Sequence, residues 1–258
     1  MLSPATAVAD AVVPLPSVLD FTDGQNGPAI ALGGGLDIGS AYAGADEIAF
    51  TVEPVIVLHY RLGDHLLFWE NLSLGWRSAL TRRLFVQAGL AYEDGLDPDD
   101  SDDGQLNGIA KRDAEATAFA EMRYSDDGSW RTWVGARIMG GEAEYGVSGE
   151  LSAGQAFGTS DGLGLEGSIY TSFGNDAFVN RDFGINASEA VSSGLAETVL
   201  PGGFTAFGIE MIYRMALAKN LQLIAEGGMT FYSSGIKRSP ITRQDYEAEI
   251  GLAAVYLF

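Results

Sequence analysis

Apolar and polar residues alternate along much of this chain with a period of two. Between residues 113 and 124, Glu115 and Glu121 share one set of alternate positions, whereas alanines, Met122 and Tyr124 occupy the other. Successive side chains of a strand point to opposite faces, so this pattern predicts a strand with one polar and one apolar face. The same alternation recurs in residues 48–60, 84–92, 130–138, 163–173, 221–231 and 250–258.

Short turn signals separate these segments. Pairs such as Gly63-Asp64 and Lys219-Asn220, and the run Asp126-Asp127-Gly128, predict tight connections between antiparallel neighbours. Many segments run about 10–15 residues, longer than the roughly 5–6 residues of soluble strands and suited to a tilted membrane crossing. Aromatic residues also gather near strand ends, as the interfacial girdles of membrane barrels do. A soluble sandwich could show the same alternation, but strand length and girdles favour a membrane barrel.

Charged residues in the middle of these strands lie on the face opposite the apolar one. A basic side chain facing lipid near the midplane costs about 2–4 kcal/mol, so we expect the charges to point into the barrel. There they either pair into a network that closes the lumen or leave a narrow polar channel, and the acid excess would favour cationic solutes. The predicted lumen charges are Glu115, Glu121, Arg123, Arg131, Arg137, Glu150, Glu166, Glu210, Arg214 and Glu226.

About eleven strands can be read, whereas single-chain bacterial barrels have even counts. The pattern therefore predicts twelve strands, with ten as the alternative, and the missed break falls within residues 53–80, at Pro54 or at Glu70-Asn71. Two long segments, 95–111 and 175–203, are predicted outer loops, with a short helix within 187–200. The fold class is a closed antiparallel transmembrane β-barrel with short periplasmic turns and longer outer loops, placed in the outer membrane of a Gram-negative cell.

Composition sets the remaining limits. The 258 residues contain no cysteine and carry a formal net charge of −20, which argues against nucleic acid as a partner. No apolar run approaches the roughly 18–20 residues of a membrane-spanning helix. Residues 1–27 show no period and are predicted to be a flexible lead-in, in which Ala7-Val8-Ala9 has the shape of a signal-peptidase site or belongs to a plain tail. The barrel is predicted to occupy residues 28–258.

The last strand provides the most specific local signal. Ile250, Leu252, Tyr256 and Phe258 alternate on one face, and the sequence stops on Phe258. A final amphipathic strand with a terminal aromatic residue resembles the signal read by the barrel-assembly machinery. The expected partners therefore include this machinery, outer-membrane lipid and lipopolysaccharide.

Three ordered motifs resemble the MltA-interacting protein family, also called the MipA/OmpV family. The hairpin at residues 39–46 (GSAYAGAD) is similar to the family's early Tyr-x-Gly-Ser/Ala-Asp loop, and a strand with Pro54 follows it. Residues 183–195 (FGINASEAVSSGL) match its FGV…A..SGL segment. Ser239-Pro240-Ile241 and the closing Tyr256-Leu257-Phe258 match its end. One departure is the loop after the fourth strand, which is basic then acidic in the family and almost purely acidic here.

The resemblance implies an outer-membrane protein without carried-over catalytic residues or cofactors. Some members are scaffolds that link a lytic transglycosylase to a penicillin-binding protein, so peptidoglycan synthases or hydrolases become candidate partners. Other members are associated with antibiotic uptake, adhesion or stress. The family match lies in the 175–203 loop, which is therefore either an interaction element or a plug over the mouth. Its candidate residues are Phe183, Gly184, Ser188, Ser193, Gly194 and Leu195.

Two further constellations could carry chemistry. His59 and His65 flank the Gly63-Asp64 turn, and with Asp64 and a nearby serine they would form a hydrolase site, although histidines at a strand end near the headgroups are the simpler interpretation. The acidic loop offers Asp97, Asp99 and Asp103 as a candidate calcium site, but no distal bidentate Glu follows, which favours a solvated loop.

The sequence therefore predicts an outer-membrane barrel that is not an enzyme and needs no cofactor or metal. The first hypothesis for its function is a scaffold or envelope-interaction protein. The alternative is a narrow channel for small, cationic solutes, and the second alternative is an outer-membrane lipid hydrolase.

Overall fold

A computed structural model describes residues 26–101, 104–142, 145–158 and 164–258. The predicted lead-in therefore lies outside the described residues, apart from its last two positions. Strands form because the alternating segments can turn one face to lipid and the other to the lumen. The strands are β1 (Gly27–Ser40), β2 (Ile48–Leu62), β3 (His65–Glu70), β4 (Ser73–Ala79), β5 (Leu84–Glu93), β6 (Glu115–Tyr124), β7 (Thr132–Gly140), β8 (Val147–Gly158), β9 (Gly164–Gly174), β10 (Gly203–Ala218), β11 (Leu221–Tyr232) and β12 (Tyr246–Leu257).

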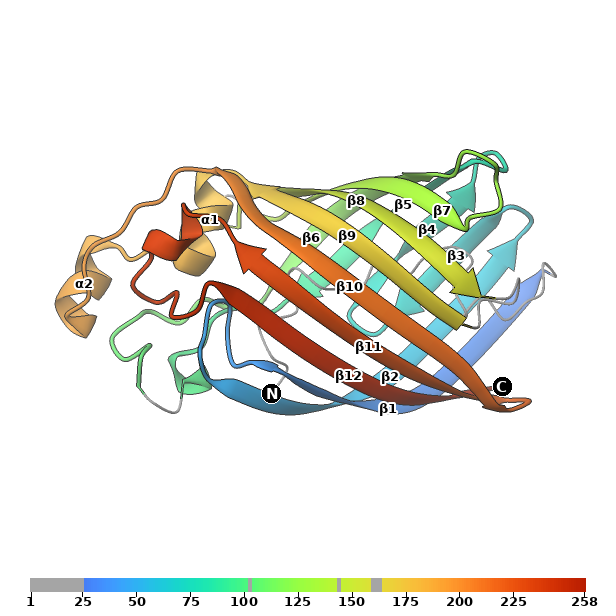
Figure 1. Cartoon of the computed structure of the whole chain (residues 1–258), viewed down its shortest axis with the longest axis horizontal. Helices are drawn as coiled ribbons and strands as arrows, with labels where there is room; N and C mark the ends of the chain where they lie inside the picture. The colour runs from blue at the N-terminus through green and yellow to red at the C-terminus, as the bar shows by residue number, and fades with distance from the viewer. Residues whose placement is uncertain (1–25, 102–103, 143–144, 159–163) are drawn as a thin grey trace.

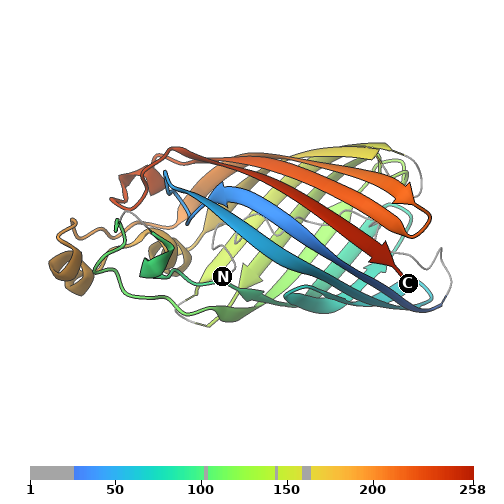
Figure 2. The same cartoon turned by 90° about the horizontal axis from the view of Figure 1, so that it is seen from below.

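The twelve strands close into one antiparallel barrel in which β1 pairs with both β2 and β12 (Figures 1 and 2). This confirms the predicted fold class and the even strand count. The break that separates β3 from β4 falls after Glu70, as one of the two candidate positions predicted, whereas Pro54 lies within β2 and marks no break. No helix in the described part of the chain is long and apolar enough to cross a membrane.

The two ends of the barrel differ. β1 starts and β12 finishes at the same end, which also carries the short connections 63–64, 80–83, 125–131 and 219–220 (Figure 1). The opposite end carries the long connections 94–114, 175–202 and 233–245. Because bacterial barrels have short periplasmic turns and long outer loops, we refer to these as the periplasmic and outer ends.

Lipid-facing and lumen-facing side chains alternate as predicted. On β1, Leu36 and Ile38 are exposed on the outside, whereas Ala31 is buried inside. On β12, Ile250 and Leu252 point outward beside them in register. This continuous apolar exterior is what a barrel needs when acyl chains, not water, surround it.

One hairpin is much shorter than the rest of the wall. β3 and β4 have 6 and 7 residues, whereas the neighbouring β2 has 15. The tip of the hairpin is fixed by Asn71, which adopts a left-handed conformation (φ 47°), as Asn tolerates more readily than most residues. Its backbone N–H donates to the Ile56 carbonyl, and its side-chain oxygen accepts from the Ile56 N–H. The hairpin therefore ends partway up the barrel wall.

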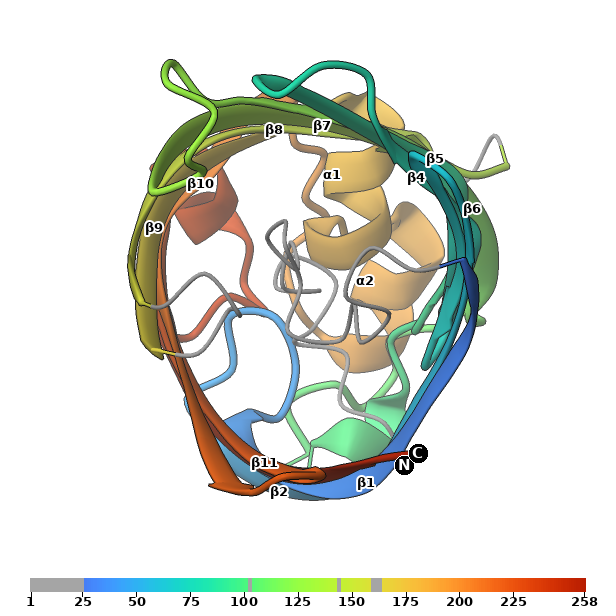
Figure 3. The same cartoon turned by 90° about the vertical axis from the view of Figure 1, so that its right-hand side faces the viewer.

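Helices appear only in the outer loops of the described chain. The 175–202 loop contains α1 (Asp176–Phe183) and α2 (Ala187–Ser193), and two single 3₁₀ turns lie at Pro98–Asp100 and Ile236–Arg238. α2 falls inside the predicted helical segment, whereas α1 was not predicted. Seen from the periplasmic end, α1 and α2 lie across the far opening (Figure 3).

One predicted lumen charge lies elsewhere. Arg131 precedes β7 in the periplasmic turn and is exposed. The preceding Trp130 has a positive φ of 59°, so the chain leaves the extended conformation there and the alternation of β7 does not reach Arg131.

Candidate functional site

The wall from β5 to β8 holds a row of paired lumen charges. Arg137 of β7 lies in register between Glu121 of β6 and Glu150 of β8. Glu121 accepts hydrogen bonds from Gln87 (2.6 Å) and from the Arg123 guanidinium (2.5 Å). Opposite charges therefore alternate across adjacent strands, which limits the cost of placing them inside the barrel.

Each of three lumen arginines also lies over an aromatic ring. Arg77 sits 4.1 Å from the ring centre of Phe68, and Arg123 sits 4.2 Å from that of Trp133. Arg137 lies 4.8 Å from the ring of Phe119. The planar guanidinium stacks favourably on a π face, so these rings support the cations where water is scarce. The sequence pattern did not assign these aromatic residues to the lumen.

The opposite wall, from β9 through β12 to β2, is dominated by carboxylates. Arg214 pairs with Glu166 at 3.6 Å, and Ser168 donates to Glu210. A side chain at Gly251 would collide with the carboxylates of Asp37 and Glu226, so these two acids converge over this glycine. Glu53 and Glu210 act electrostatically on the Glu226 carboxylate, and Glu226 acts in turn on that of Glu249. The lumen is thus balanced on one side and acidic on the other.

Glu226 and the other predicted acids of this wall, Glu166 and Glu210, lie in the lumen as expected. Asp37, Glu249 and Glu247 were missed, although simple alternation with Leu36, Ile38 and Ile250 places them on the inward face. Glu115 also faces inward at the outer end of β6, where it accepts the Glu142 N–H.

Side chains from α1 pack into the outer mouth. Phe178, Val179 and Phe183 are buried in one cluster with Tyr145 of the 141–146 connection and Tyr232 of β11. Phe183 meets the Tyr232 ring edge to face at 5.5 Å. Burial of about 150–250 Å² by each aromatic side chain makes such a cluster a stable plug. We call α1, α2 and the loops packed on them the outer cap.

A second cluster joins the loops of the cap. Ile185 follows α1 and packs with Leu106 and Ile109 of the 94–114 loop and with Ile241 of the 233–245 loop. The Ser239 hydroxyl donates to the Phe183 carbonyl at 2.6 Å. The two sequence motifs around Phe183 and Ser239 therefore meet in space and hold the cap together.

Glu189 of α2 links two loops of the cap through hydrogen bonds. One carboxylate oxygen accepts from the Asn186 N–H in a capping box, and the other accepts from the Ala110 N–H at 3.1 Å. The Arg112 guanidinium lies 3.4 Å from it and donates to the Gly184 carbonyl. Burial lowers the pKa of Arg112, and the nearby Glu189 carboxylate opposes this shift.

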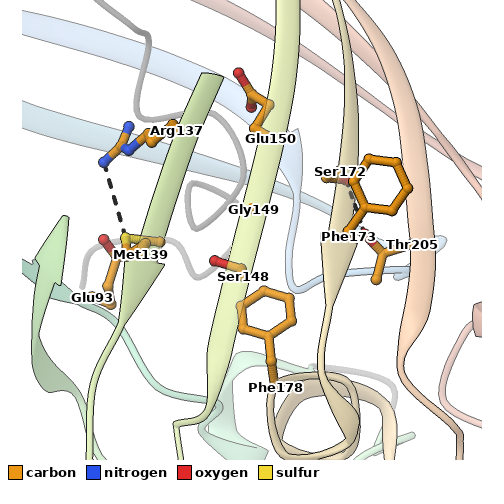
Figure 4. Close-up of a pocket in the computed structure, with 10 residues that line it drawn as sticks. All are labelled: Glu93, Arg137, Met139, Ser148, Gly149, Glu150, Ser172, Phe173, Phe178 and Thr205. Atoms are coloured by element: carbon orange, nitrogen blue, oxygen red, sulfur yellow. Dashed lines mark hydrogen bonds between the residues drawn. The ribbon is translucent and has the colours of Figure 1, made fainter. Parts of the chain in front are cut away.

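Beneath the cap lies a hollow that is partly open to solvent and contains about 490 Å³ of empty space. Phe178 of α1 lines its outer side, and Arg137, Glu150 and Glu93 reach it from the barrel wall (Figure 4). Both charges and apolar surface therefore face this space, which lies within the barrel and under the plug.

The predicted interaction residues divide between buried and exposed positions. Phe183 and Gly184 are buried in the cap, and Ser188 is exposed on α2. Ser193 donates to the Glu189 carbonyl, and Gly194 terminates α2 in the left-handed conformation (φ 73°). Leu195 packs partly against the second cluster. The predicted insertion signal lies on the lipid-facing side of β12 and at the chain end, as Ile250, Leu252, Tyr256 and Phe258.

The two histidines do not converge. His59 faces the lumen and shares a 2.6 Å hydrogen bond with Glu70, which also accepts from Arg77. His65 lies on the outward face and packs against Trp76. The geometry offers no shared site for the two rings.

Within the acidic loop, Asp97 bonds Lys111 at 2.5 Å and accepts the Asp99 N–H. The Lys111 hydrogen bond lowers the pKa of Asp97. Asp103 lies outside the described residues, and the described residues contain no cluster of metal-ligating side chains.

Comparison with known families decides the relationship that the motifs suggested. The model of the MltA-interacting protein MipA family matches residues 32–258, which include most of β1, all of the strands from β2 to β12 and the cap. This chain belongs to the MipA family. No curated relative matches it significantly. The chain is thus an outer-membrane β-barrel of the MipA family.

Several solved barrels align with most of the chain. The Pseudomonas putida toluene transporter TodX is 10% identical and covers 90% of this chain and 89% of its own, with a TM-score of 0.41. The CymD monoaromatic hydrocarbon channel is 10% identical over 90% of this chain and 88% of its own, with a TM-score of 0.47. The KdgM porin is 8% identical over 88% and 99%, with a TM-score of 0.41. Such distant likenesses carry no inference about function.

Proposed function

We propose that this protein is an outer-membrane scaffold that binds a peptidoglycan hydrolase of the MltA type and has no catalytic activity of its own. The observation that supports this most is the outer cap, whose loops pack on one another and on the barrel wall at the outer mouth through buried residues. A barrel with packed loops across one opening offers surfaces for binding more readily than a path for solutes. The family name supports the class of partner.

The docking face of such a scaffold is the periplasmic end, because peptidoglycan enzymes work in the periplasm. The cap residues predicted as an interaction element lie at the other end. At the periplasmic end, Arg82, Arg83 and Arg131 are all exposed. Their two turns are in contact, because the Ser125 N–H donates to the Arg83 carbonyl and Gly128 packs on Arg82. In a chain of net charge −20, this cationic group is distinctive.

The test measures binding of a purified MltA-type lytic transglycosylase to the barrel in lipid nanodiscs. The triple variant R82E/R83E/R131E should bind at least about tenfold more weakly, mainly through slower association. The outer-end variant K237E/R238E is the control and should bind like the wild type. Equal binding by wild type and both variants would contradict the docking face, and no binding at all would contradict the scaffold.

One observation favours a second function. The acidic wall formed by Asp37, Glu53, Glu226 and Glu249 would attract cations if the cap opened, as a narrow channel requires. Cation-selective openings of the wild type in planar bilayers would support this channel. A lipid hydrolase gains no support, because His59 is occupied by Glu70 inside the lumen.

A further inference from the structure

The short hairpin leaves a notch in the barrel wall. β3 pairs with β2 only from Val57 to Leu62, and Asn71 adds two hydrogen bonds at Ile56. In the described chain, the outer part of β2, residues 48–55, therefore has a strand partner on its β1 side only. At about 3.3 Å per residue, this free edge is about 26 Å long. We call the open side of this edge, above the hairpin tip, the wall notch.

Exposed fractions support the free edge. Ile48, Phe50 and Val52 are 75, 62 and 68% exposed on β2. Their partners on β1 are Leu36, opposite Val52, and Ile38, opposite Phe50, which are 45 and 49% exposed. Both sets face lipid, but the β2 side chains lack a neighbour on one flank.

Backbone polarity at the notch is asymmetric. Ile56 turns its N–H and C=O toward β3, so the alternate residues Ile48, Phe50, Val52 and Pro54 turn theirs toward the notch. The edge thus presents three N–H donors and four carbonyl acceptors, because Pro54 has no N–H. No backbone bond among the described residues reaches these groups from the notch side.

The notch lies in the apolar band, in its outer half. Leu36, Ile38, Ile250 and Leu252 form the lipid-facing row beside it, and Tyr60 marks the periplasmic end of the same β2 strand. Unsatisfied backbone groups facing hydrocarbon cost several kcal/mol each. The occupant must therefore be apolar and also able to hydrogen-bond, with donors for the edge carbonyls as well as acceptors for the edge N–H groups.

We propose that the wall notch binds one outer-leaflet glycolipid through an amide-linked, 3-hydroxylated acyl chain that lies along the edge of β2. The amide N–H and the 3-hydroxyl donate to the carbonyls of Phe50, Val52 or Pro54, and the amide carbonyl accepts from an edge N–H. Acyl esters of phospholipids supply acceptors only at this depth, so they leave the carbonyls unpaired. This inference rests on the proposed outer-membrane location and is independent of the scaffold role.

The first arm of the test removes edge donors. Val52→Pro deletes an N–H that points away from β1, so the β1–β2 ladder survives as it does at Pro54. Val52→Ala is the matched control, because it shortens the side chain and keeps the N–H. Native mass spectrometry of barrels extracted in mild detergent then counts bound lipid A. We expect about one lipid A per wild-type and Val52→Ala barrel, and at least about a threefold lower occupancy for Val52→Pro.

The second arm changes the ligand and needs no variant. Wild-type barrels in phospholipid nanodiscs receive lipid A or a synthetic analogue without the 3-hydroxyl groups, and we expect about tenfold weaker retention of the analogue. Equal retention of the two, or a phosphatidylethanolamine signal that replaces both, would overturn the proposal. A barrel absent from the outer-membrane fraction of cells would instead overturn its proposed location, whatever lipid it binds in vitro.

Discussion

Replacement of Glu189 by alanine should open the outer cap without unfolding the barrel. The carboxylate is buried and accepts hydrogen bonds from the N–H groups of Asn186 and Ala110, and it lies beside the guanidinium of Arg112. The variant loses all three contacts at once. It also leaves Arg112 buried with less compensating charge, although the guanidinium still donates to the Gly184 carbonyl.

The expected cost follows from these contacts. Loss of an N-terminal capping interaction costs about 1 kcal/mol, and loss of a hydrogen bond to a charged group costs about 1.5–3 kcal/mol. Together they should destabilise the closed cap by roughly 2–4 kcal/mol, which raises the local opening constant by about 30- to 1000-fold. The barrel wall contributes none of these bonds, so its global unfolding should not change.

Hydrogen exchange in nanodiscs measures this opening directly. The amides of Ala110, Asn186 and Ala190 should exchange faster in the variant by that factor, whereas strand amides keep their rates. Glu197→Ala is the control, because Glu197 is an exposed carboxylate in the same loop. If the cap amides exchanged at the same rate in Glu189→Ala and Glu197→Ala, the proposed role of Glu189 in holding the cap loops together would be refuted.

Three further predictions concern the wall, the turns and the plug. Gly208→Ala places a methyl 2.1 Å from the Tyr170 ring, so it should lower the free energy of unfolding in urea by about 1–3 kcal/mol. Gly167→Ala is the control and should be neutral, because its methyl would make only an ordinary contact with the Glu210 carbonyl at 3.9 Å. The hydrogen bond from the Ser129 N–H lowers the pKa of Asp127 from its ordinary value of 3.8. Hydrogen exchange of the Ser129 amide, corrected for its intrinsic rate, should therefore stay constant from pH 7 to 4 and rise only at lower pH. A rise near pH 6 would contradict this prediction. Phe178→Ala should increase proteolysis of the 175–202 loop at least about tenfold, and unchanged cleavage would show that the ring does not hold the plug.

The architecture could be predicted because its physics is local in sequence. A strand between lipid and lumen must alternate, so the period of two located most strands and placed Glu121, Arg123 and Glu210 inside. Parity then required a twelfth strand, and the Glu70-Asn71 position supplied the break.

Other features depend on contacts between distant segments. The pattern gives no length for β3 and β4, because their stop is set by the bonds between Asn71 and Ile56 of another strand. The stacking of Arg123 on Trp133 similarly joins two strands. Arg131 was misplaced because one positive φ at Trp130 ends the alternation, and a single sequence does not reveal such a residue.

The sequence pattern predicted only one of the two helices of the cap. Asn186 and Glu189 form a capping box that can be read from their spacing, and α2 was predicted in this region. α1 was missed because its eight residues contain only three buried side chains and a short polar face. The hydrogen bond from Ser239 to Phe183 joins residues that are 56 positions apart, and a local sequence pattern cannot predict such a contact.

Planar-bilayer recording tests the closed cap most directly. The wild type is compared with a variant in which residues 176–201 are replaced by a short Gly/Ser connection. The cap account predicts a silent wild type and a variant with steady, cation-selective conductance, because removal of the plug exposes the acidic lumen wall. A wild type that conducts as steadily as the variant would contradict the account.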